Sequence, residues 1–205
     1  MTTGGEGGML VMHDSCLWEK AWAYKDHGKS HDAVFERSHP PGFRWLHESF
    51  GSNFRMTEMQ SAIGRLQLGK LPEWLATRRR NAAILSDGFS TIPGIRVTMP
   101  PPHFGHAYYK YYAFVETEAL KAGWSATRIQ EAVNAEGVPC LAGSCPEIYL
   151  ERAFTDRGWG PARRLPAAQR LGETSLMFMV HPTLGEAEMS DTLSAVAKVM
   201  RAAVQ

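Results

Sequence analysis

The sequence predicts an α/β protein, and three observations lead to that class. Apolar runs of strand length at 108–115 and 176–180 are each followed by a stretch with helical periodicity. The stretch that begins at Ser125 carries apolar residues on one face and closes at Gly137, and the last helix, to residue 203, repeats apolar residues every three or four positions. Hydrophobic residues make up 44% of the 205-residue chain, which is enough to build a core. Alternating strands and helices favour a sheet with helices packed on it.

The N-terminal segment combines a glycine cluster with a short apolar run. Glycines 4, 5, 7 and 8 surround Glu6 and lead into residues 9–12. Such glycines permit tight turns, so we expect a turn that feeds a buried strand. A helix is then expected to start near Asp14 or Ser15, by N-cap chemistry, and to end at Gly28.

Residues 29–53 show no regular period. They contain His31, His39 and His47 and a Pro-Pro-Gly triplet at 40–42. A connection of this length in a compact protein is usually functional or mobile.

A capping box at Thr57 predicts the start of a central helix. Gln60 stands three residues after Thr57, as the box requires. We expect this helix to end or kink at Leu71-Pro72 and a second helix to start there, because proline suits a first helical turn. The second helix carries the basic triplet 78–80, which we interpret as a solvated face without a ligand.

Prolines 100–102 cannot continue a helix or a central strand and indicate a boundary. We therefore divide the chain at residue 90, with a separate small α/β domain at 91–205. Within that domain, Thr183 and Glu186 resemble another capping box, ahead of the last helix.

Composition argues against several classes of protein. The 22 basic and 21 acidic residues give a net charge of +1, which disfavours nucleic-acid binding. No apolar run approaches the roughly 18 residues of a membrane span, and no segment resembles a signal peptide. Three cysteines form no disulfide framework and fit a reducing cytosol, so we expect a cytoplasmic protein. The histidine and cysteine spacings do not match a metal site, and we expect none.

Asn53 and Arg55 are the sharpest candidates for a binding site. They precede a helix N-terminus, where free amides and the helix dipole favour an anion such as phosphate. On these residues alone, a turn asparagine and an arginine paired with a surface carboxylate remains an equal alternative. The glycine cluster is not a dinucleotide-binding loop, because a strand should precede such a loop and a helix should follow it. Glu6 has no partner carboxylate and is not assigned acid or base chemistry.

Three segments together resemble the DegT/DnrJ/StrS family of sugar aminotransferases, which depend on pyridoxal 5'-phosphate (PLP). They are the glycine cluster 4–9 with residues 24–28, the stretch 51–64 with Gln67 and Leu68, and the pair 106–109 and 181–184. The resemblance runs nearly from end to end and is most specific in the middle segment. It implies the C-terminal half of a fold type I transferase, in which residues 1–90 are a remnant of the large cofactor-binding domain with its linking helices.

The resemblance also implies roles for single residues. Asn53 and Arg55 match positions that reach the cofactor phosphate across a homodimer, and His106 and Tyr108 lie where the family lines the substrate side of the cleft. The family's Schiff-base lysine falls just before the glycine cluster, so no lysine of this chain matches it. We therefore assign no catalytic residue to the chain.

The resulting hypothesis is a transaminase for a keto-sugar nucleotide with an amino-acid donor, inactive as an isolated chain because the proton transfer lacks its lysine. The alternative is a non-catalytic remnant or dimerisation module of the same fold. A third reading, a small metal-binding protein, would require stoichiometric zinc.

Overall fold

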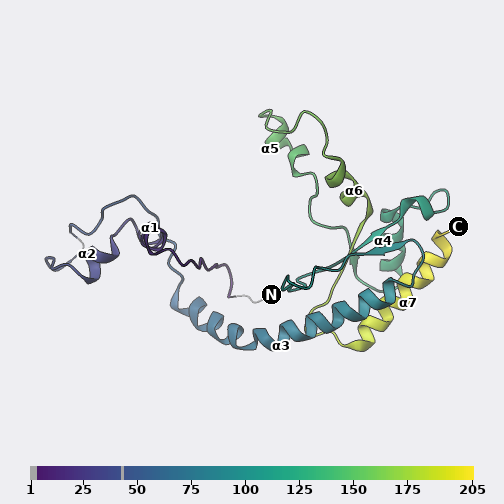
Figure 1. Cartoon of the computed structure of the whole chain (residues 1–205), viewed down its shortest axis with the longest axis horizontal. Helices are drawn as coiled ribbons and strands as arrows, with labels where there is room; N and C mark the ends of the chain where they lie inside the picture. The colour runs from purple at the N-terminus through teal and green to yellow at the C-terminus, as the bar shows by residue number, and fades with distance from the viewer. Residues whose placement is uncertain (1–3, 43) are drawn as a thin grey trace. The chain divides into compact units, whose positions relative to one another are not determined.

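The computed structural model describes residues 4–42 and 44–205. The chain divides into two compact units, Met1–Leu71 and Pro72–Gln205, and each is described by itself. The division falls within one long helix, α3 (Figure 1). The expected domain division at residue 90 stays a prediction. Within the described residues, no helix is both long and apolar enough to cross a bilayer.

Two short helices organise the first unit. Helix α1, Ser15–Lys25, begins as expected, because the Asp14 carboxylate accepts a hydrogen bond from the Leu17 amide at 2.9 Å. Helix α2, His31–Phe35, is capped in the same way by Ser30, whose hydroxyl oxygen accepts from the Ala33 amide. The sequence reasoning missed α2, because five residues are too few to display a helical period.

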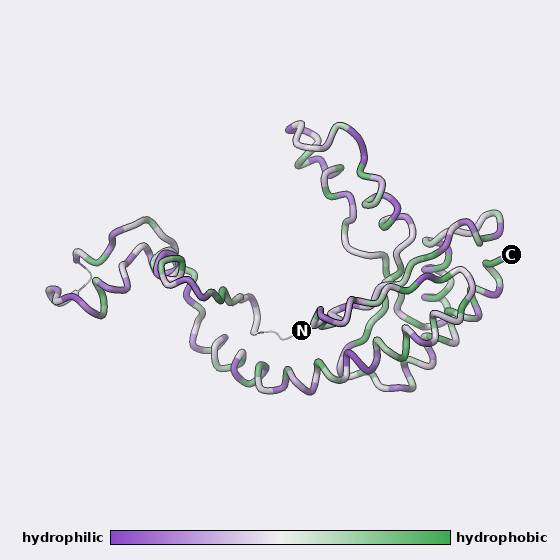
Figure 2. The backbone as a smooth tube through the Cα atoms, in the orientation of Figure 1, coloured by the Kyte–Doolittle hydropathy of each residue, from purple (hydrophilic) through white to green (hydrophobic). Residues whose placement is uncertain are grey.

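The strand expected at residues 9–12 does not form. Met9, Leu10 and Val11 are 84%, 73% and 82% exposed, in the extended green segment that precedes α1 in Figure 2. An isolated strand cannot satisfy its backbone hydrogen bonds, and no described segment of the chain pairs with this one. The prediction was wrong because apolar composition cannot supply a neighbouring strand.

Helix α3, Glu58–Phe89, runs through the position where a break was expected. The capping box is confirmed: the Gln60 amide donates to the Thr57 hydroxyl at 3.3 Å, and the Thr57 amide donates to the Gln60 side chain at 3.3 Å. Pro72 lies inside the helix instead of starting a second one. A proline removes one amide from the helical ladder, and here the turns on either side of it remain helical.

The second unit contains a four-stranded antiparallel sheet of order β1-β2-β4-β3. Its strands are β1 Ile95–Val97, β2 Tyr111–Val115, β3 Cys140–Leu141 and β4 Ser175–Phe178. The two central strands were expected, and their register places Tyr111 opposite Phe178 and Ala113 opposite Leu176. The edge strands β1 and β3 were not expected, since two or three residues carry no readable alternation. Residues 108–110, assigned to the strand by sequence, form the loop before β2.

Helices α4 and α7 belong to the same unit and pack against each other (Figure 1). Helix α4, Ala126–Ala135, is capped by Ser125 as expected, and α7 spans Glu186–Ala203. The cap of α7 lies two residues later than expected, because the Gly185 amide donates to the Glu188 carboxylate at 2.7 Å. The remaining helices are the 3₁₀ turns Thr117–Ala119 and Ile148–Leu150, α5 Arg152–Thr155 and α6 Pro166–Thr174.

The core of this unit lies where α3, α4 and α7 meet the sheet. The Phe89 ring of α3 lies 5.0 Å from Phe178 and 5.9 Å from Tyr111. The expected stripe of α7 is confirmed, since Met189, Val196, Met200 and Ala203 are buried and Leu193 packs against the cluster. Figure 2 shows apolar and polar residues interspersed along α3 and α7, and the buried residues of α3 lie between Arg78 and Phe89.

Candidate cofactor and substrate sites

The loop that carries Asn53 and Arg55 is fastened to the end of α1. Asp26 and Asn53 form an antiparallel bridge, and the His27 amide donates to the Ser52 carbonyl at 3.1 Å. Gly28, with φ +86°, makes the approach possible: a Cβ there would lie 1.8 Å from the Ser49 carbonyl oxygen. Only glycine combines this backbone angle with so close a contact. The turn after α1 therefore positions the two candidate residues.

Four polar side chains meet at this turn. The Arg55 Nε donates to Asn53 Oδ1 at 3.2 Å and lies 3.6 Å from Asp26 Oδ1. The Arg55 Nη2 lies 3.4 Å from His27 Nε2, which must accept because a guanidinium can only donate. The sequence predicted Asn53 and Arg55 together; Asp26 and His27 join them only through the fold.

Asp26 is the electrostatic centre of this cluster and is only 8% exposed. Burial tends to raise the pKa of its carboxyl, but a hydrogen bond from Lys29 and the positive charges of Lys29, Arg55 and Lys25 outweigh burial and lower that pKa. Asp26 therefore stays ionised. The carboxylate of Asp26 lies near three cations, Lys29, Arg55 and Lys25, so the four-residue cluster together with these two lysines carries net positive charge.

The cluster fits a phosphate group. The Arg55 side chain is about half exposed, 49%, which leaves guanidinium donors open to a ligand. Asn53 uses its amide oxygen on Arg55, and its amide nitrogen has no partner among the described residues. An exposed guanidinium and an amide donor in a net positive setting are suitable for phosphate oxygens.

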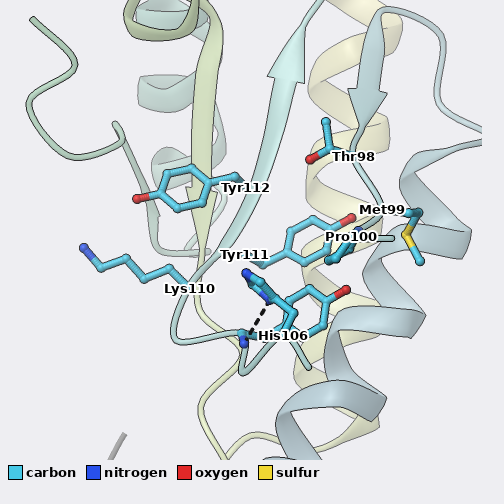
Figure 3. Close-up of a pocket in the computed structure, with 8 residues that line it drawn as sticks. Thr98, Met99, Pro100, His106, Lys110, Tyr111 and Tyr112 are labelled. Atoms are coloured by element: carbon cyan, nitrogen blue, oxygen red, sulfur yellow. Dashed lines mark hydrogen bonds between the residues drawn. The ribbon is translucent and has the colours of Figure 1, made fainter. Parts of the chain in front are cut away.

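His106 and Tyr108 lie together in the second unit, beside a cavity of about 200 Å³ (Figure 3). The centroids of their rings are 4.3 Å apart in an edge-on contact, and the Tyr108 ring stacks on the Tyr111 ring with 6.4 Å between centroids. The Tyr111 ring extends to one side of β2 and the Lys110 and Tyr112 side chains to the other. The remaining lining residues are Thr98, Met99 and Pro100.

Two arginines that the sequence analysis set aside hold this segment in place. Arg78 is only 3% exposed and donates to the Tyr108 carbonyl at 3.2 Å and the Tyr109 carbonyl at 3.1 Å. Arg79 donates to the His106 carbonyl at 3.2 Å. The interpretation of residues 78–80 as a solvated face was wrong for Arg78. Its spacing was a usable signal, because Arg78 is in helical phase with the buried Ala82, Leu85 and Phe89.

The described residues contain no group of three histidine, cysteine or acidic side chains arranged to hold a metal ion. The four histidines of residues 27–47 are used differently: His31 packs at 5.0 Å from Trp18 and 5.1 Å from Trp22, and His27 contacts Arg55.

Solved structures define the fold class. The chain superposes on an aminotransferase from Psychrobacter cryohalolentis with a TM-score of 0.88 and 48% identity, covering 94% of this chain and 51% of that one. The Streptomyces venezuelae protein DesV shares the fold at 22% identity and a TM-score of 0.76, with coverages of 93% and 46%. The fold is that of the fold type I PLP-dependent aminotransferases, of which this chain spans about half.

The sequence matches the DegT/DnrJ/EryC1/StrS aminotransferase family over residues 1–197, and the chain belongs to this family. A curated relative, L-glutamine:2-deoxy-scyllo-inosose aminotransferase of Streptoalloteichus tenebrarius, is 30% identical over 219 residues, with 97% of this chain and 50% of the relative covered. The aminotransferases of this family depend on PLP. The chain spans about half the length of the curated relatives it matches.

Proposed function

We propose that this chain supplies part of a PLP-dependent transaminase that acts on a keto-sugar nucleotide with an amino-acid donor. We further propose that the intact enzyme is a cytoplasmic homodimer with shared active sites. The observation that carries the proposal is the positive cluster around Asn53 and Arg55, whose free donors suit a phosphate. Membership of the family supports the reaction class.

In this proposal the chain holds and orients ligands. The Asn53 amide nitrogen and the Arg55 guanidinium bind the cofactor phosphate, and His27 and Asp26 keep Arg55 in place. His106 and Tyr108 line the substrate side. PLP, when bound, supplies an electron sink for the proton transfer at the substrate carbon.

The isolated chain should not catalyse the reaction. None of its lysines matches the position of the family's cofactor lysine, and proton transfer needs that amine. Lys25 lies 4.8 Å from the centre of the Trp22 ring, and Lys29 pairs with Asp26, so both are engaged in local contacts.

The test combines this chain with the half of the Psychrobacter aminotransferase that it does not match. Each half is assayed alone and in mixture for amino transfer from glutamate to keto-sugar nucleotides, and PLP retention is measured by absorbance after gel filtration. We expect no turnover by this chain alone and turnover with PLP retention by the mixture. Turnover by the chain alone would contradict the assigned inactivity, and a mixture that associates but neither retains PLP nor turns over would contradict the function.

Variants then test the phosphate site. Asn53→Ala should weaken PLP retention by the mixture about tenfold, the scale of one hydrogen bond to a charged group. Arg55→Met should weaken it further, because it also removes a positive charge. Arg65→Met is the matched control, since Arg65 is exposed on α3 and its side chain forms no ion pair with any described residue. Equal PLP affinity in Arg55→Met and Arg65→Met would show that this cluster does not bind the phosphate.

One observation favours a second candidate, a non-catalytic dimerisation module. The first unit exposes large apolar side chains both at residues 9–11 and on α3, where Met59 and Leu66 are strongly exposed. Sedimentation velocity of the chain alone distinguishes the candidates: a stable dimer without PLP binding in any mixture supports the module.

A further inference from the structure

Arg78 occupies an unusual position for an arginine. Its neighbours in the same helical stripe are the apolar core residues Ala82, Leu85 and Phe89, and its guanidinium is buried with them. No ion pair joins it to a carboxylate in the described part of the chain. Burial lowers the pKa of Arg78 from its ordinary value, which reports the desolvation of its charge. An apolar side chain could occupy this buried position without the cost of desolvating a charge, so the presence of an arginine here needs an explanation.

The hydrogen bonds that Arg78 donates are accepted by a strained backbone segment. Tyr108 has φ +44°, the left-handed region that bulky residues rarely adopt. Such a conformation persists only where its surroundings fix it. The carbonyl of Tyr108 and the next carbonyl, that of Tyr109, both accept from Arg78 Nη1. Arg78 thus fixes the backbone at the left-handed residue.

The same backbone conformation orients the His106 ring. The Tyr108 amide donates to His106 Nδ1 at 3.1 Å, the dashed bond in Figure 3. Because Nδ1 accepts, the neutral ring carries its proton on Nε2. The Nε2–H group makes no hydrogen bond with any described residue, so it can donate to a ligand oxygen beside the cavity.

We infer that Arg78 is a positioning residue for substrate recognition: it holds Tyr108 in the left-handed conformation, which fixes His106 as an Nε2–H donor to an oxygen of the sugar nucleotide. The part of this inference that concerns substrate rests on the proposed function. The part that concerns the His106 ring does not, and it can be tested on the chain without cofactor or substrate.

The experiment follows His106 by nitrogen-15 NMR of the histidine-labelled full chain, with His106→Gln to assign the signals. In the wild-type chain at alkaline pH, the ring nitrogens should show the pattern of a fixed Nε2–H tautomer. In Arg78→Met this pattern should average between tautomers, and the Tyr108 amide should exchange with deuterium about tenfold faster. Arg80→Met is the matched control, because Arg80 is exposed on the same helix and forms no ion pair within the part of the chain that the structure describes.

Arg78→Lys keeps the charge and most of the stem, and covers the case in which Arg78→Met does not fold. A lysine has one ammonium group in place of the planar fork, so we expect an intermediate NMR pattern. A His106 signature unchanged in the folded Arg78 variants, with only reduced stability, would overturn the inference and leave Arg78 a structural residue.

The mixture with the Psychrobacter half tests the substrate part. Arg78→Lys should raise KM for the sugar nucleotide about tenfold and leave KM for glutamate unchanged. Equal KM values in wild type and variant would overturn the recognition role. A wild-type mixture that associates but neither retains PLP nor turns over would contradict the proposed function instead, while the NMR result would still decide what Arg78 does to His106.

Discussion

The hydrogen bond between Ser86 and Tyr111 provides a sharp test of how α3 is attached to the sheet. The two hydroxyl oxygens are 2.9 Å apart, and the residues are only 4% and 2% exposed. Each hydroxyl has little access to water, so removing one leaves the other to find a partner inside the protein. The Tyr111 ring also stacks with the Tyr108 ring, with 6.4 Å between the ring centroids.

The two single substitutions should differ in cost. Ser86→Ala leaves the buried tyrosine hydroxyl unpaired, which should destabilise the second unit by about 1–3 kcal/mol. Tyr111→Phe should cost less, about 1 kcal/mol, because the Ser86 hydroxyl can turn to the carbonyl four residues earlier in α3. The double variant should lose about 1 kcal/mol less than the sum of the single losses.

Hydrogen exchange of the β2 and β4 amides measures the free energy of opening of this unit and avoids the need for two-state unfolding of the whole chain. Stability losses that add within about 0.3 kcal/mol would refute the reasoning, because they would show that the two hydroxyls are not coupled.

The pH dependence of the stability gives a second check. Burial raises the pKa of Tyr111, so its neutral form stabilises the fold below pH 10, and this contribution is lost as the pH rises above 10. Tyr111→Phe should remove that alkaline loss.

Three further predictions concern other parts of the chain. The hydrogen bonds from Arg164 and from a tyrosine hydroxyl lower the pKa of Glu147 to about 2. The loop that these bonds hold should therefore keep its amide protection from exchange down to pH 4.5 and lose it as the pH falls towards 2. In Glu147→Gln this acid dependence should vanish. Gly28→Ala should disrupt the turn after α1, and the amides of that turn should exchange faster. Gly64→Ala should instead stabilise α3 by about 0.5–1 kcal/mol, because a Cβ at that position meets nothing within 4 Å. Equal effects of the two substitutions would contradict the packing described at Gly28. Burial raises the pKa of Cys140 to about 12, so a thiol reagent at pH 8 should modify the two exposed cysteines rapidly and Cys140 only on unfolding; rapid labelling of three thiols would be the contrary result.

Local signals in the sequence were sufficient for many of the elements. The caps at Asp14, Thr57 and Ser125 were read correctly, because a cap depends on residues within one helical turn. The stripe of α7 was predicted correctly for another reason, because its period repeats along all 18 residues of the helix. The short α2 and the edge strands β1 and β3 were missed, because their formation depends on partners and not on a repeated pattern.

The candidate sites also contain residues that the sequence predicted and residues that only the fold brought to them. Asn53 and Arg55 form a local motif, and the sequence placed them together; Asp26 and His27 reach them only because the chain turns at Gly28 and returns at Asn53. The apolar run at 9–12 was predicted as a strand, but pairing is a tertiary property and no described segment pairs with it.

The sequence by itself determined the family and the helix caps, and it placed Asn53 and Arg55 in one local motif, because each of these depends on residues close together along the chain. Only the tertiary structure decided the role of Arg78. Its basic neighbours suggested a solvated face, yet its helical phase buries it against the core, where two carbonyls from a segment thirty residues away accept its hydrogen bonds. The helical phase of Arg78 was a local signal of its burial, but its hydrogen-bond partners depend on how α3 packs against the loop before β2, and no local pattern encodes that packing.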